Sequence, residues 1–90
     1  MSNTTDNQQV EKLIRDFIAV NLLYSTDGFP HKDDTSLLKE GIIDSLGVVE
    51  LMEFAQKEFG VKVEPLEVTP DNFDSVTKLG VFIRRKRGTL

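Results

Sequence analysis

Apolar residues recur at helical spacing near the start of the chain. The repeat follows the i, i+3, i+4 pattern of an amphipathic helix, with Val10, Leu13, Ile14, Phe17, Ile18 and Leu22 on one stripe. The pattern predicts a helix that begins at about Asp6 and turns this stripe toward a core. The polar residues 1–5 and the final residues 88–90 are expected to be disordered.

A second helical segment is predicted from Ser45 to Phe59. Gly60 follows it, and glycine is favoured just beyond a helix C-terminus. On a helical wheel the core-facing positions are Val48, Leu51, Met52, Ala55 and Phe59. Phe54 falls between the two faces, and the pattern does not assign it to either one.

Two further helices are predicted in the last third of the chain. Val61 and Val63 alternate with polar residues, which indicates a short extended piece. Thr69 and Pro70 then fit the N-cap and first position of a short helix that carries Phe73. After residues 74–75 comes the stripe of the last helix, which ends in a basic run at 84–87 and consists of Val76, Leu79, Phe82 and Ile83.

Residues 24–44 separate the first two helices and contain several turn-forming residues. Loops of about 20 residues are uncommon in compact domains and are usually functional or disordered. Apolar residues in the second half predict that this half packs on the core: Leu37, Leu38, Ile42 and Ile43. The whole pattern predicts one all-α domain over residues 1–90, a four-helix bundle of three main helices and one short helix.

Composition narrows the classes of function. The chain has no cysteine, which removes disulfides and thiolate metal sites and fits a cytoplasmic location. The net charge of −4 disfavours nucleic acid and suits a basic protein surface. We expect no membrane partner, because the chain has neither a signal-peptide pattern nor an apolar run of about 20 residues. The basic run at 84–87 favours the negative end of its helix, and binding to nucleic acid or acidic lipid is the alternative.

No catalytic constellation or metal site is evident in the sequence. The single histidine, His31, lies in the turn-rich loop without an adjacent base or nucleophile, and an exposed loop residue is expected there. Asp33 and Asp34 lack the spacing of a calcium-binding EF-hand loop, so a solvated turn is expected. We therefore expect a protein that is not itself an enzyme.

The pair Asp44-Ser45 stands at the head of the second helix and has two interpretations. Serine is favoured at an N-cap, so Ser45 is a candidate cap. Against this, no Glu or Gln completes a capping box, and Gly47 in the first turn costs about 1 kcal/mol in helix propensity relative to alanine. A helix N-terminus also accommodates a phosphate group, so the Ser45 hydroxyl is a candidate for carrying a phosphoester. The same pair recurs at 74–75, where Ser75 is expected to be a plain cap.

The face of the second helix opposite the core stripe carries both apolar and acidic residues: Leu46, Val49, Glu50 and Glu53. A transient protein contact uses this combination, because carboxylates steer a basic partner and aliphatic groups supply buried area. The alternative is that Leu46 covers the end of the bundle, since isolated exposed apolar residues are ordinary.

The run Asp44 to Leu51, D-S-L-x-x-x-E-L, resembles the attachment motif of acyl carrier proteins and related carrier domains. The resemblance extends over "DDTSLLKEGIIDSLGVVELMEFAQKEFGVKV" and "VTPDNFDSVTKLGVFI", which is most of the chain. It implies an acyl-carrier-like helical bundle in which a phosphopantetheinyl transferase attaches 4′-phosphopantetheine from coenzyme A to Ser45. Asp44, Leu46, Glu50 and Leu51 match the surrounding motif.

The resemblance implies a monomeric carrier that holds acyl groups as thioesters for loading ligases and biosynthetic enzymes of fatty-acid, polyketide or related pathways. Two features depart from typical fatty-acid carriers: two residues, Ile42 and Ile43, separate Gly41 from the Asp-Ser pair, and the second helix is less acidic. The longer spacing is similar to free-standing carriers of amino acids, D-alanine included. An aminoacyl or peptidyl carrier therefore stays open, as does a helical interaction module without a prosthetic group.

Overall fold

The computed structural model describes residues 3–88, and the regular secondary structure in that range is helical, with no strand. Its α-helices are α1 (Asn3–Phe17), α2 (Ser45–Phe59), α3 (Pro70–Phe73) and α4 (Val76–Arg87). A π-helical segment, η1 (Ile18–Leu22), continues α1, and a 3₁₀ turn, η2 (Pro65–Glu67), precedes α3. The predicted all-α fold with three main helices and one short helix is confirmed.

The helix boundaries follow the sequence pattern closely. α1 begins at Asn3, ahead of the expected Asp6, and the apolar stripe predicted up to Leu22 spans both α1 and η1. α2 has the predicted bounds, and α3 begins at Pro70 and carries Phe73 as predicted. The disorder expected at 1–5 and 88–90 stays a prediction, and residues 1, 2, 89 and 90 lie outside the described range.

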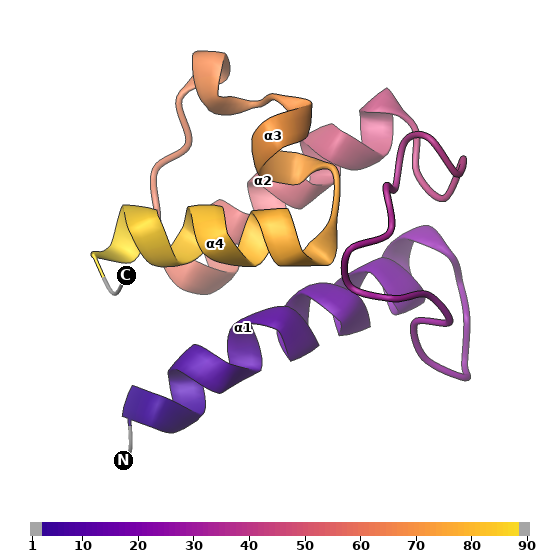
Figure 1. The fold of residues 1–90 in the computed structure, drawn as a ribbon, viewed down its shortest axis with the longest axis horizontal. Coiled ribbons are helices and arrows are strands. Elements are labelled where there is room, and N and C mark those ends of the chain that lie inside the picture. Colours follow the sequence, from indigo (N-terminus) through magenta and orange to yellow (C-terminus); the bar gives the residue numbers. More distant parts are fainter. Residues whose placement is uncertain (1–2, 89–90) are drawn as a thin grey trace.

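α4 lies between α1 and α3, and α2 lies behind it in the view of Figure 1. The apolar stripes of the helices meet in one core, because each helix has only one face to bury. The long loop also contributes to this core. The fully buried large side chains of the core are Val10, Ile14, Ile18, Leu37, Leu51, Phe73, Val76, Leu79, Phe82 and Ile83.

Phe54, which the helical wheel left unassigned, joins α2 to α1. Its ring stacks on that of Phe17 with centroids 4.3 Å apart, and it meets the edge of Phe59 at 5.6 Å. Offset and edge-to-face aromatic contacts of this kind contribute about 0.5–1.5 kcal/mol beyond buried area. Phe54 therefore packs against the flank of the core.

The second half of the long loop is held to the body of the protein by Asp74. The backbone N–H of Leu38 donates to the Asp74 carboxylate at 2.9 Å, and the Ser36 hydroxyl donates to the other carboxylate oxygen. The N–H of Leu37 donates to the Asp74 carbonyl at 2.8 Å. The predicted packing is confirmed for Leu37 and Ile43, whereas Leu38 is exposed because its side chain faces away from the core.

An ion pair joins α1 to α4. Both guanidinium nitrogens of Arg84 donate to the two carboxylate oxygens of Glu11, and the side chains are only 15% and 21% exposed. Burial raises the pKa of Glu11, but the hydrogen bonds and charge of Arg84 outweigh it, so the Glu11 pKa lies below its usual value. The hydrogen bonds to Glu11 raise the pKa of Arg84. The lack of a side chain at Gly80 makes room for the Glu11 carboxylate, because a Cβ at residue 80 would overlap it.

Other charges of the C-terminal basic run and the loop also have partners inside the chain. Lys86 binds both carboxylate oxygens of Glu67 at 2.9 and 3.0 Å. A hydrogen bond from the Glu64 N–H and those from Lys86 lower the pKa of Glu67. Asp33 lies in a turn, as expected, and its partly exposed carboxylate also pairs with Arg15 of α1 at 2.7 Å. Arg84 and Lys86 of the basic run therefore form ion pairs within the fold.

Candidate functional site

Asp44, and not Ser45, caps α2. Asp44 has extended backbone angles (φ −111°, ψ −170°), and its carboxylate accepts a hydrogen bond from the Gly47 N–H at 3.0 Å. Ser45 is the first residue of the helix and is exposed. Among residues 3–88, no group hydrogen-bonds to the Ser45 hydroxyl. The interpretation of Ser45 as the cap is therefore wrong, and its hydroxyl is not used in capping the helix.

Ser75, in the second Asp-Ser pair, has the opposite role. Its side chain is 3% exposed, and its hydroxyl oxygen accepts a hydrogen bond from the Lys78 N–H at 3.0 Å. Ser75 is thus the N-cap of α4, as predicted. The same dipeptide differs in function because it differs by one position in its register to the helix: the aspartate caps α2, and the serine caps α4.

Gly47 is present because the chain passes very close to the head of α2. An ideal Cβ on Gly47 would lie 2.9 Å from the Cβ of Ile43, closer than such atoms approach in proteins. Ile43 is buried against the core just before the cap. The absence of a side chain at Gly47 therefore permits tight packing of the segment that presents Ser45, at the cost of a lower helix propensity.

Because Asp44 is the N-cap of α2, its substitution is expected to change the stability of the protein. Asp44→Ala is expected to lower the free energy of unfolding by about 0.5–2 kcal/mol, because the Gly47 N–H loses its acceptor. Urea denaturation at neutral pH measures this loss. Asp44→Asn is the matched control, since asparagine caps as well as aspartate. Equal losses for both variants would show that the charge of Asp44, rather than the cap, is what stabilises the helix.

An apolar cleft lies beside Ser45, between α2 and the segment that leads into α3. Its volume is about 320 Å³, and Ser45 stands at its edge. Apart from Ser45, Thr69 and Pro70, the lining consists of Leu38, Val48, Val49, Val68 and Phe73. A group attached to the Ser45 hydroxyl thus has apolar surface within immediate reach.

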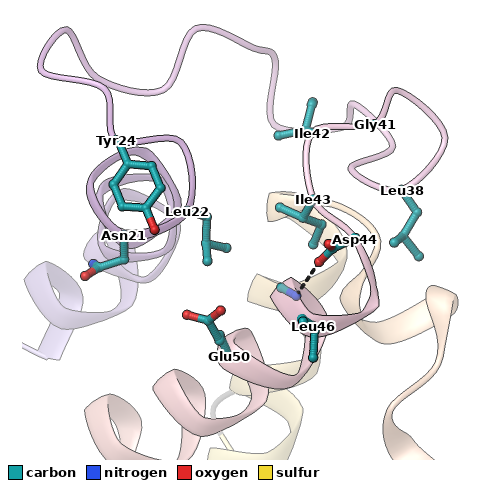
Figure 2. A pocket seen from close by; sticks show the side chains of 11 residues that line it. Asn21, Leu22, Tyr24, Leu38, Gly41, Ile42, Ile43, Asp44, Leu46 and Glu50 are labelled. Atoms are coloured by element: carbon teal, nitrogen blue, oxygen red, sulfur yellow. Dashed lines mark hydrogen bonds between the residues drawn. The ribbon is translucent and has the colours of Figure 1, made fainter.

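A larger groove of about 600 Å³ lies between the end of the first helix and the start of α2. Figure 2 shows Asn21, Leu22 and Tyr24 on one side, with Leu46 and Glu50 of α2 on the other. The capping Asp44 also lines it. The groove and the apolar cleft therefore flank the residue pair at the head of α2.

The structure brings the predicted partner-binding residues onto one exposed face of α2. Leu46 is 71% exposed and Val49 43% exposed, and Glu50 and Glu53 are exposed as well. Their spacing of three and four residues places them in line along the helix. Glu50 and Glu53 also line a shallow pocket over the stacked ring of Phe54. The exposure of Leu46 does not distinguish a partner contact from an ordinary exposed apolar residue, so the partner-binding role stays a prediction.

Other candidate chemistries find little support among the described residues. His31 is exposed, and its ring meets the edge of Phe29. Within residues 3–88, no three His, Cys, Asp or Glu side chains gather as a metal site would require. None of the helices in that range combines the length and the apolar character needed to cross a bilayer.

Tyr24, Asn21 and Leu38 border the site, but the sequence pattern did not indicate them. Asn21 is a polar residue just before Leu22, the last position of the predicted stripe, and Tyr24 follows that stripe, where periodicity no longer assigns a face. Leu38 was assigned to the core on hydrophobicity alone, yet it is 38% exposed and lines both the cleft and the groove. No local signal in the sequence distinguishes these residues from ordinary loop residues.

Comparison with known proteins supports the resemblance to carrier proteins. No protein-family model matches the chain. Among curated proteins, it is similar to a D-alanyl carrier protein of Abiotrophia defectiva, with 32% identity over 57 residues. The match covers 63% of this chain and 72% of that protein.

Proposed function

The chain belongs to the family of phosphopantetheine-bearing carrier proteins, and from this premise we propose that Ser45 carries the prosthetic arm. Carrier proteins of this family bear a covalently attached 4′-phosphopantetheine. The observation that carries the assignment is the free, exposed Ser45 hydroxyl at the first position of α2. Ser75 is a poor candidate, because its hydroxyl is buried and engaged.

The head of α2 fits the phosphate that joins such an arm to serine. The first N–H groups of a helix have no acceptor within the helix. Asp44 satisfies the N–H of Gly47, and among residues 3–88 the N–H groups of Ser45 and Leu46 donate to no other group. These two donors and the positive end of the helix dipole stabilise a phosphate anion on Ser45.

The chemistry required of this chain is limited. During attachment the Ser45 oxygen gives its proton to a base of the transferase and forms a bond to the phosphorus next to the pantetheine. The pyrophosphate P–O bond of coenzyme A breaks, and the nucleotide part leaves with the second phosphate. The arm, when bound, supplies a terminal thiol that holds cargo as a thioester. The transferase and the loading enzyme supply catalysis, so the carrier only has to present the arm and release each partner quickly. Tethering raises the effective concentration of the cargo at each enzyme.

We further propose that the cargo is an aminoacyl group, with D-alanine as the first candidate. Two observations support this choice: the relative is named a D-alanyl carrier protein, and two residues separate Gly41 from the Asp-Ser pair. A short acyl group of a fatty-acid, polyketide or related pathway is the second candidate. The apolar cleft beside Ser45 favours it, because that cleft offers cover to a hydrocarbon chain.

The exposed stripe of Leu46, Val49, Glu50 and Glu53 is the proposed contact for the phosphopantetheinyl transferase, loading ligase and downstream enzymes. Aliphatic groups surrounded by carboxylates suit a weak contact with a basic surface. Such contacts are sensitive to salt, because exposed charges are screened.

Intact-mass spectrometry after coexpression with a phosphopantetheinyl transferase tests the proposal. We expect the mass to rise by one phosphopantetheine group, with the modified peptide containing Ser45. An unchanged mass with several transferases would instead favour a helical interaction module without a prosthetic group.

The nature of the cargo is tested by loading the modified protein. We expect thioester formation with an ATP-dependent ligase specific for D-alanine, detected as a mass increase that hydroxylamine reverses. An acyl-loading enzyme with a short fatty acid serves as the comparison. Loading by the second enzyme alone would assign the chain to acyl transfer and contradict the aminoacyl proposal.

A further inference from the structure

Tyr24 combines an unusual backbone conformation with an exposed ring. Among residues 3–88 five have positive φ, and four of these are glycines: Gly28, Gly41, Gly60 and Gly88. Tyr24 is the exception, with φ of 54°. The left-handed region disfavours residues with a Cβ, so glycine would suit this helix end better. The side chain is 84% exposed, so packing within the chain does not offset the strain.

The position of Tyr24 indicates what its ring contacts. The residue stands at the rim of the groove beside the head of α2, across from Glu50 (Figure 2). The groove is lined by two carboxylates, those of Asp44 and Glu50, and by no basic side chain. The hydroxyl end of the ring points toward the groove and the ring face is exposed (Figure 2). An exposed aromatic face near a carboxylate suits a guanidinium group, which stacks on the ring and pairs with the acid.

We propose that this groove docks an arginine of the phosphopantetheinyl transferase, with its guanidinium stacked on Tyr24 and paired with Glu50. The inference rests on the proposed role of Ser45 and extends the partner surface from α2 across to the end of the first helix. Tyr24 thus joins the partner contact that the sequence predicted on α2 alone.

The chemistry of attachment favours the transferase over other partners. Asp44 and Leu46, the chain neighbours of Ser45, line the groove. An enzyme that brings phosphorus to the Ser45 oxygen must therefore cover it. That enzyme also binds the phosphates of coenzyme A, which requires basic side chains near the reacting serine. Enzymes that act on the far end of a long arm have no such requirement.

Steady-state transfer from coenzyme A to the unmodified full chain tests the proposal. Tyr24→Gly is expected to lower kcat/KM roughly three- to tenfold, mainly through KM, because an exposed cation–π contact is lost. Its melting temperature should not fall, since glycine relieves the strained φ. Tyr24→Phe should stay within about twofold of wild type, because the aromatic face remains. Val20→Ala, which removes exposed apolar surface outside the groove, should leave transfer unchanged.

A double-mutant cycle with Glu50→Gln tests whether both residues hold the same cation. We expect the double variant to be less impaired than the product of the two single effects, because each change removes part of one contact. Effects that multiply would contradict a shared cation. This inference alone is overturned if Tyr24→Gly receives the arm as fast as the wild type does. It is also overturned if the variant is impaired only in the later loading of cargo. A wild-type chain that accepts no arm would overturn the proposed function as well.

Discussion

Ser45→Ala is expected to abolish attachment of the arm and to leave the free energy of unfolding within about 0.5 kcal/mol of wild type. The hydroxyl is exposed and makes no hydrogen bond within residues 3–88, while Asp44 keeps the helix capped. Intact-mass spectrometry after coexpression with a transferase measures the first effect, and urea denaturation measures the second.

Ser75→Ala is the matched control, because it removes the same atom from the second Asp-Ser pair. This variant should accept the arm normally and lose about 0.5–2 kcal/mol of stability, since the Lys78 N–H loses its capping acceptor. Ser45→Ala is thus expected to lose attachment and keep its stability, whereas Ser75→Ala keeps attachment and loses stability. Attachment to Ser45→Ala at the wild-type level would place the arm elsewhere and refute the assignment of the site.

Arg84→Met is expected to lower the free energy of unfolding by about 1.5–3 kcal/mol at neutral pH. The substitution keeps most of the apolar stem but removes both hydrogen bonds to the Glu11 carboxylate, which stays partly buried between α1 and α4. A buried carboxylate without its partner is strongly unfavourable. Urea denaturation of the variant and the wild type measures the difference.

The effect of Arg84→Met should shrink on acidification. In the wild type the lowered pKa of Glu11 stabilises the fold above the usual value of 4.5, and that contribution is lost as the pH falls through the native pKa. In the variant, the Glu11 pKa is higher than in the wild type, because burial remains while the hydrogen bonds and charge of Arg84 are lost, so protonation relieves the penalty. The difference between the two proteins is therefore expected to be smaller at pH 3 than at pH 7. A difference independent of pH would show that lost packing, rather than charge, causes the destabilisation.

Lys12→Met is the control for a solvent-exposed ion pair. Lys12 bonds to Asp16 at 2.8 Å, one turn along α1, and both side chains are more than half exposed. Such i, i+4 pairs contribute about 0.3–0.5 kcal/mol. The contrast with Arg84→Met separates the effect of burial from that of charge.

The sequence alone determined the helices and the identity of the candidate site. Apolar periodicity and local start and stop signals predicted the bounds of α2 and α4 and the start of α3, because these signals act within one or two turns. The signals are Gly60, Pro70 and Ser75. The run from Asp44 to Leu51 pointed to a carrier protein, and the exposed face of α2 followed from its spacing.

The tertiary structure decided which serine is free, where Phe54 packs and what borders the site. The two Asp-Ser pairs are identical as dipeptides, and only their register to the following helix separates the exposed hydroxyl of Ser45 from the capping hydroxyl of Ser75. The sequence marked Gly47 as unfavourable in a helix, but only the backbone path shows that Ile43 leaves no room there for a Cβ. Tyr24 lies across the groove from a helix about 20 residues away, so its place beside the site depends on segments that folding brings together. Residue patterns predict where helices begin and end, whereas these roles depend on the exact backbone path and on contacts between segments.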